Sequence, residues 1–348
     1  MSIEFKPRCL ATGIGSLPHK DAPQAVDLIL RYSPEIPFWP QLPKISLKES
    51  MTAQFSENLP GIEFKDKGIV FNASTDKDEA LSKFYEKIIA VDTDYFAVTK
   101  EFASGLYAFI DRLKTKKPEG IELLKGQSIG PFTLAASIKQ PDGRLVLNDP
   151  LLMDAVVNGL GMKAYWQIKQ LKNYCQKVII FFDEPYLGCF GSGFTPVTRE
   201  EVIKRLNDLI EPLRQEKEVF FGVHCCGNTD WSMLMEAKLD IISFDAFGYL
   251  ERLVLYGQDL KKFFERGGIL AWGIIPTSEF KDQSQEELIA RFEKGLGALE
   301  KKGISKDLVL ERSLITPSCG MATLSEGNAE EILRLASQVS GALRKKYF

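Results

Sequence analysis

Short apolar runs recur along the chain and alternate with longer segments in which apolar residues have helical spacing. The runs are continuously apolar, which is typical of parallel strands that are buried on both faces of a sheet. The run at 36–42 is weaker because it contains prolines, which cannot donate a hydrogen bond to a neighbouring strand. Strands are predicted at 9–14, 36–42, 121–129, 177–182, 219–223, 240–244, 269–275 and 314–316.

Helix signals follow most of the predicted strands. Thr198 with Glu201, and Ser284 with Glu287, have the spacing of N-terminal capping pairs. A stretch at 68–72 fits one arm of a hairpin outside the main fold. Helices are predicted after Asp21, after Ser284, and over 78–90, 101–113, 150–174, 198–215 and 328–344.

Strands that alternate with helices along the whole chain predict one α/β domain covering residues 1–348. The simplest architecture with this pattern is a single (β/α)8 TIM barrel. The alternative is an open doubly wound sheet. The chain has no G-x-G-x-x-G turn that opens a helix, which counts against the alternative.

Composition limits the classes of function. The chain has 348 residues, 45% of them hydrophobic, and a net charge of −3, so we expect a globular protein with a large core and no nucleic-acid partner. No apolar run reaches the roughly 20 residues of a membrane span, and residues 1–6 have no apolar signal core, so no membrane partner is expected. The six cysteines form no disulfide framework, which favours a cytoplasmic location.

Polar residues gather at the carboxyl ends of the predicted strands. In a TIM barrel these ends share one face, and that face carries the active site. Residues far apart in the sequence are therefore expected to meet there. The residues at or just after these strand ends are Ser16, Gln127, Asp183, His224, Cys226, Asp245 and Cys319.

This convergence predicts a zinc site made by His224, Cys226 and Cys319. One imidazole and two thiolates suit zinc, and three protein ligands leave a fourth position for a substrate. Zinc in such a site would hold a substrate thiol as a nucleophilic thiolate, and Asp245 could be a displaceable fourth ligand. Two other interpretations of the His-x-Cys pair remain, a chance pair and half of a structural zinc site.

The motifs around these residues resemble known families, in the same order along nearly the whole chain. Residues 224–229 (HCCGNT) resemble the His-x-Cys-Gly-Asn-Thr zinc motif of methylcobalamin:coenzyme M methyltransferases. These enzymes share a barrel superfamily with uroporphyrinogen decarboxylase and cobalamin-independent methionine synthase. Motifs similar to those of the methionine synthase catalytic domain are 13–18 (GIGSLP), 130–133 (GPFT), 179–185 (IIFFDEP), 240–245 (DIISFD) and 317–320 (PSCG).

The resemblance implies a role for each matching residue. His224, Cys226 and Cys319 would bind Zn²⁺, and Asp245 would stand where the family has a zinc-binding glutamate. The remaining candidates are Ile14, Ser16 and Asp183. The first two would bind the carboxylate of homocysteine, and Asp183, also the catalytic candidate, would bind its ammonium group. The homocysteine thiol would take the open position on zinc.

Departures from the family bear on the methyl donor. No aromatic residue stands near Ser137, where the family has a folate-stacking tryptophan, and no histidine stands near Ser278, where it has a proton relay. The glutamate that helps to bind the homocysteine amine has no clear counterpart over 44–49. The sequence is thus closer to short enzymes that take methyl from a corrinoid, free or bound to a partner protein.

We therefore predict a zinc-dependent methyltransferase that converts homocysteine to methionine with a methylcorrinoid donor. A corrinoid:coenzyme M-type thiol methyltransferase uses the same chemistry and is the nearest alternative. A uroporphyrinogen decarboxylase-like enzyme would need no zinc, so two cysteines at ligand positions argue against it. A non-enzymatic protein that binds a corrinoid, or holds zinc for structure, is a further alternative.

Overall fold

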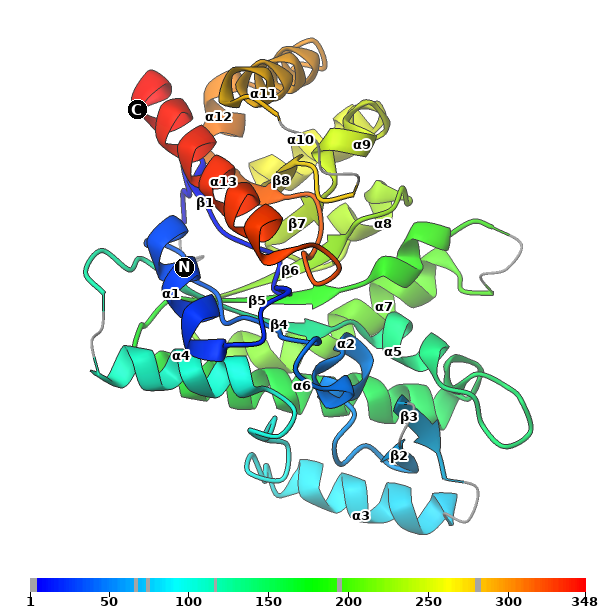
Figure 1. The fold of residues 1–348 in the computed structure, drawn as a ribbon. Helices are drawn as coiled ribbons and strands as arrows, with labels where there is room; N and C mark the ends of the chain where they lie inside the picture. Colours follow the sequence, from blue (N-terminus) through cyan, green and yellow to red (C-terminus); the bar gives the residue numbers. More distant parts are fainter. Residues whose placement is uncertain (1–4, 66–67, 73–75, 116–117, 193–195, 279–282) are drawn as a thin grey trace.

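The computed structural model describes residues 5–65, 68–72, 76–115, 118–192, 196–278 and 283–348. Its centre is a curled parallel sheet of seven strands (Figure 1). In sheet order the strands are β1 (Leu10–Ala11), β9 (Ser313–Pro317), β8 (Ile269–Ile275), β7 (Ile241–Phe244), β6 (Val219–Cys225), β5 (Val178–Asp183) and β4 (Leu124–Ile129). Each strand lies at a predicted position.

The expected strand at 36–42 is not a strand of this sheet. It forms isolated parallel bridges instead, from Phe38 to Lys125 on β4 and from Gln41 to Ser16 beyond β1. Pro37 and Pro40 lack the N–H groups that a continuous ladder would need. The predicted α/β fold with a curled parallel sheet is thus confirmed. The eighth strand of a closed barrel is not present among the described residues.

The sheet order also decides between the two predicted architectures. From β4 to β9 each strand pairs with the next strand along the chain, and β1 follows β9. A doubly wound sheet reverses its strand order at a central switch point, and the described sheet has no such reversal.

Helices cover the outside of the sheet, and local capping explains where several of them start. Asp21 accepts a hydrogen bond from the Gln24 amide, and Ser284 and Glu287 form a reciprocal capping box. The helices are α1 (Ala22–Tyr32), α2 (Met51–Gln54), α3 (Lys77–Ile89), α4 (Ser104–Thr115), α5 (Pro131–Ser137), α6 (Pro150–Lys172), α7 (Arg199–Ile210), α8 (Trp231–Glu236), α9 (Ala246–Leu253), α10 (Gly257–Glu265), α11 (Gln285–Glu300), α12 (Lys306–Glu311) and α13 (Glu326–Tyr347).

A small antiparallel hairpin lies outside the sheet, close to α3 (Figure 1). It consists of β2 (Ile62–Lys65) and β3 (Gly68–Phe71), so the hairpin arm predicted at 68–72 is confirmed. Across the described ranges, no helix has both the length and the apolarity needed to cross a membrane.

The inside of the curled sheet is apolar at one end and polar at the other. A cluster of buried apolar side chains fills the end where the strands begin; it contains Phe5, Leu10, Ile36, Leu123, Ile179, Phe181, Phe220, Ile241, Ile269, Ala271 and Leu314. Polar side chains therefore meet at the opposite end, where the strands finish.

Candidate metal centre and substrate cavity

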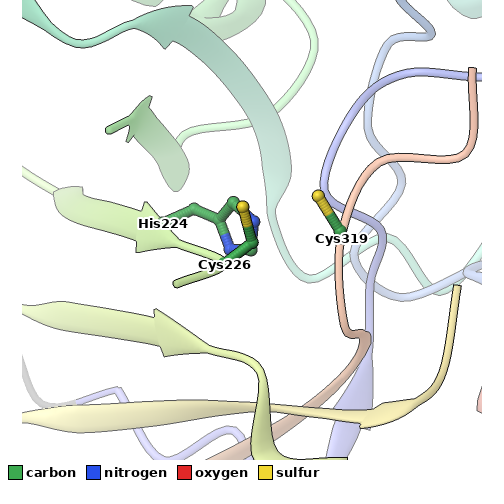
Figure 2. A group of neighbouring side chains, drawn as sticks. All are labelled: His224, Cys226 and Cys319. Atoms are coloured by element: carbon green, nitrogen blue, oxygen red, sulfur yellow. The ribbon is translucent and has the colours of Figure 1, made fainter. Parts of the chain in front are cut away.

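His224, Cys226 and Cys319 meet at the carboxyl ends of β6 and β9 (Figure 2). Their metal-binding atoms all lie within 4.8 Å of one another. Side chains alternate along a strand, so His224 and Cys226 share one side of β6. The intervening Cys225 is fully buried, and its thiol donates to the carbonyl of Gly227, as expected of a packing residue. The structure thus brings together the three residues that the sequence predicted as one site.

Two glycines allow the loops that carry the cysteines to approach their neighbours. A Cβ atom on Gly227 would lie 2.9 Å from the Cα atom of Gly188, which belongs to the loop after β5. A Cβ atom on Gly320 would lie 2.2 Å from Oγ of Ser16. The clash at Gly227 is with backbone and would force a loop to shift, whereas the clash at Gly320 is with the Ser16 hydroxyl, which can rotate.

The donor atoms suit a divalent metal ion. Nδ1 of His224 lies 3.0 Å from Oγ of Ser243 on β7, which orients the ring, and Nε2 is buried without a hydrogen-bond partner. The nearby Cys319 and His224 side chains lower the pKa of the Cys226 thiol to about 4, and the proximity of Cys226 raises the pKa of Cys319. A cation at this point would hold both sulfurs as thiolates and would use the unpartnered Nε2 atom.

Asp245 has a different position. Among the residues that the structure describes, the group able to hold a metal consists of His224, Cys226 and Cys319 and does not include Asp245. The Asp245 carboxylate caps α9 instead, and it accepts a hydrogen bond of 2.8 Å from the Gly248 amide. A fourth ligand at Asp245, as predicted, would require the carboxylate to turn away from this cap.

A cavity of about 330 Å³ is lined in part by His224, Cys226 and Cys319. Its lining includes Ile14, Ser16 and Asp183, the three residues predicted to bind substrate. Gln127, the other strand-end candidate, is buried beneath the site and donates to the carbonyl of Trp39. The lining also includes a residue that the sequence did not single out, Glu49.

Two buried carboxylates face this cavity, and each has an oxygen without a hydrogen-bond partner. These oxygens are Oδ1 of Asp183 and Oε2 of Glu49. The other Glu49 oxygen accepts a hydrogen bond of 2.5 Å from Ser104. Burial raises the pKa of Asp183 to about 6 and also raises the pKa of Glu49. Unpartnered buried acceptors of this kind are suited to a cationic ligand group.

The sequence showed no clear counterpart over 44–49 for the amine-binding glutamate, and Glu49, the last residue of that range, lines the cavity. Glu49 ends a 3₁₀ turn, Leu47–Glu49, that is capped by Ser46. Its position in the cavity depends on the path of the chain after the 36–42 segment. The capping serine was the available signal, but it marks the turn and does not indicate where the carboxylate points.

Together these features define a curled parallel α/β fold with a His/Cys/Cys group at the carboxyl ends of its strands. Among solved structures, the chain is similar to a B12-independent methionine synthase from Shewanella sp. W3-18-1 in complex with selenomethionine. The identity is 18%, the TM-score is 0.56, and the match covers 99% of this chain and 96% of that one. A likeness at this identity establishes a shared fold.

A second solved structure is more distant. It is the GH113 β-mannanase AaManA from Alicyclobacillus acidocaldarius in complex with ManMIm. The identity is 10%, the TM-score is 0.35, and the match covers 70% of this chain and 78% of that one, which is too weak to support any argument. Comparison with protein-family models gives no match, and neither does comparison with curated proteins.

Proposed function

We propose that this chain is a zinc-dependent methyltransferase that transfers a methyl group to the thiol of homocysteine and so forms methionine. The observation that carries the proposal is the juxtaposition of His224, Cys226 and Cys319 with a cavity whose other polar groups suit an amino acid. The shared fold with a methionine synthase supports it. That structure contains selenomethionine, the selenium analogue of the product proposed here.

The three ligands supply the reactive end of the site. Zinc bound by His224, Cys226 and Cys319 would lower the pKa of a substrate thiol, which makes the sulfur a nucleophile for methyl transfer. Ser243 hydrogen bonds with Nδ1 of the His224 ring, which leaves Nε2 for the metal. The three donor atoms lie within 4.8 Å of one another, so small side-chain adjustments would bring them to a common metal ion.

The rest of the cavity would bind the amino-acid end of homocysteine. Asp183 and Glu49 supply negative charge for the ammonium group, while Ile14 and Ser16 supply backbone and hydroxyl groups for the carboxylate. Coenzyme M carries a sulfonate and no ammonium group, so the two carboxylates would repel it. The charges of the cavity therefore favour homocysteine over coenzyme M as the methyl acceptor.

The lining argues against decarboxylation of a porphyrinogen. That reaction needs basic side chains around several substrate carboxylates, whereas the described lining contains two carboxylates and no lysine or arginine. Repulsion between like charges would disfavour such a substrate. Thiol methylation fits the same residues without this conflict.

We also propose a methylcorrinoid, free or protein-bound, as the donor. Methyl transfer from cobalt(III) leaves cobalt(I), which needs no proton, whereas a folate leaving group does. The chain has two histidines, and the second, His19, is not among the residues that line the cavity. A donor that needs no general acid therefore fits the available side chains.

The test is methionine formation by purified zinc-loaded protein. We expect methionine, measured by mass spectrometry, from homocysteine with methylcobalamin and none with methyl-tetrahydrofolate. Calorimetric titration of homocysteine in the absence of a donor tests the acceptor separately. Methionine from the folate alone would contradict the donor, and binding of coenzyme M without binding of homocysteine would contradict the acceptor.

A further inference from the structure

Lys125 is a buried lysine that does not line the cavity but contacts Ile14, which does. It lies on β4 and has no exposed surface. Its ammonium group donates to the carbonyl of Ile14 at 2.6 Å and to Oε1 of Gln127 at 3.3 Å. It also lies 4.5 Å from the centre of the Phe181 ring. Because burying an ammonium group costs several kcal/mol, these contacts call for an explanation beyond packing.

The Ile14 contact fixes a segment that lines the cavity. β1 ends at Ala11, and the chain then continues through Ile14 and Ser16 outside any strand. The 36–42 segment holds the next residue, since the amide of Gln41 donates a hydrogen bond to the carbonyl of Gly15. Lys125 joins the Ile14 carbonyl to β4 across 111 residues of sequence.

We propose that Lys125 is a positioning residue that sets the Ile14–Ser16 backbone for the carboxylate of the amino-acid substrate. This inference rests on the proposed function. Lys125 does not line the cavity, so it would act through Ile14. A fixed backbone lowers the entropy that the segment loses when it closes on a carboxylate.

Asp183 and Gln127 are the other polar groups around the Lys125 side chain. Burial lowers the pKa of Lys125 to about 7, and the carboxylate of Asp183 on the adjacent strand opposes that shift. Gln127 accepts from Lys125 and donates to the Trp39 carbonyl, which links the ammonium group to the 36–42 segment. Lys125 therefore connects the segment after β1 with β4 and, through Gln127, with the 36–42 segment.

The experiment compares two thiols by calorimetric titration of zinc-loaded protein. Homocysteine carries the carboxylate, while 3-aminopropane-1-thiol has the same thiol and amine without it. For Lys125→Met we expect the dissociation constant of homocysteine to rise about tenfold more than that of the aminothiol. Bound zinc should stay at the wild-type level, since Lys125 contacts no zinc ligand in the described hydrogen bonds.

Lys163 provides a matched control. It is also a fully buried lysine, it lies on α6, and its ammonium group has no hydrogen-bond partner within the described residues. Lys163→Met should leave the ratio of the two dissociation constants unchanged. Lys125→Gln keeps a polar group for Gln127 but is too short to reach Ile14, so it should repeat the preferential loss if Lys125→Met does not fold.

Two outcomes separate this inference from the function on which it rests. If wild type binds homocysteine and a folded Lys125 variant weakens both thiols equally, the positioning role is wrong and the proposed function stands. If zinc-loaded wild type binds neither thiol, the proposed function is wrong, and the role of Lys125 is wrong with it.

Discussion

The cysteines of the chain differ in their surroundings and therefore in their expected chemistry. Cys9 and Cys225 are buried, and burial raises the pKa of each thiol to about 12. Cys226 and Cys319 are partly exposed at the cavity and contact each other. Thiolate character and access control both metal binding and reactivity, so the two pairs should behave differently.

Removing one sulfur ligand should abolish stoichiometric zinc binding without unfolding the protein. Cys319→Ala leaves His224 and Cys226 as the remaining ligands, and two ligands hold zinc far more weakly than three. Zinc content by mass spectrometry and far-UV circular dichroism measure the two effects. Cys225→Ala is the matched control and should keep its zinc. Full zinc occupancy in Cys319→Ala would exclude the proposed ligand set.

Asp183 should control how homocysteine binding depends on pH. Burial raises the pKa of Asp183 to about 6, and only the ionised carboxylate attracts an ammonium group. Affinity should therefore fall as the pH drops from about 7.5 through about 6 to about 5. Asp183→Asn should remove this dependence and weaken binding at neutral pH by roughly 1.5–3 kcal/mol. Calorimetric titration at several pH values measures both effects.

Binding of a thiol to zinc also depends on pH, because the thiol loses its proton. The effect of Asp183 must therefore be separated with a ligand that has no ammonium group. 4-Mercaptobutanoate is homocysteine without its ammonium group, so its binding reports the pH dependence of the zinc-bound thiol and the carboxylate alone. Its pH profile should be the same in wild type and Asp183→Asn. A homocysteine profile that is also unchanged by Asp183→Asn would contradict the role of this carboxylate.

At the scale of elements, a buried carboxylate joins β5 to α5. Gly130 precedes α5 and has no side chain to cap it. Glu184, just after β5, accepts hydrogen bonds of 2.9 Å from the amides of Phe132 and Thr133 and one of 2.6 Å from the Thr133 hydroxyl. The first turn of α5 is thus capped by a residue more than fifty positions away, which fixes the helix against the end of β5.

Loss of this carboxylate should destabilise the fold. Glu184→Ala leaves three buried donors without an acceptor, so the free energy of unfolding should fall by about 3 kcal/mol. Urea unfolding measures the change. Ser284→Ala, which removes an exposed cap of α11, is a control and should cost about 1 kcal/mol. Equal losses in the two variants would argue against the buried cap.

Glu184 should also contribute to the pH dependence of stability. Burial raises its pKa to about 7, although hydrogen bonds from Thr133 and Phe132 oppose the shift. The folded state then binds a proton more tightly than the unfolded state, so this contribution to stability falls as the pH rises from about 4.5 through about 7. The side chain in Glu184→Gln cannot ionise, so this part of the decrease in unfolding free energy with rising pH should disappear. Parallel stability profiles for wild type and Glu184→Gln would contradict the shift.

The strands were predictable because a parallel strand buried on both faces must be apolar along its length. Every predicted run except 36–42 became a strand, and there Pro37 and Pro40 replaced a ladder with single bridges. His224, Cys226 and Cys319 were predictable for a related reason. They directly follow strands, and the strand ends converge.

Other parts of the site depend on features that no local pattern encodes. Asp245 also follows a strand, but position alone does not distinguish a metal ligand from a helix cap. Glu49 lies in a short turn far from any strand end, and only the tertiary path of the chain brings it to the cavity. Sequence patterns thus predicted the His/Cys/Cys group better than the carboxylates that line the cavity.

For the whole molecule, the metal should add stability without being needed for folding. His224 and Cys319 come from strands far apart in the sequence, so zinc would tie two distant parts of the sheet together. The fold nevertheless has an extensive apolar core that includes none of the three ligands. A metal that binds only the folded state stabilises it by about 2.7 kcal/mol when its free concentration is 100 times its dissociation constant.

We therefore expect chelation to lower the melting temperature by several degrees and to leave the far-UV circular dichroism spectrum at room temperature unchanged. Differential scanning calorimetry of wild type with and without zinc measures the shift. Cys319→Ala should melt at the same temperature in both conditions, whereas Cys225→Ala should respond to zinc as wild type does. Loss of helical signal on chelation would instead indicate a structural zinc site, because a metal needed for folding unfolds the chain when it leaves. A metal that leaves behind a folded but inactive protein belongs to the substrate cavity, as the positions of His224, Cys226 and Cys319 beside it suggest.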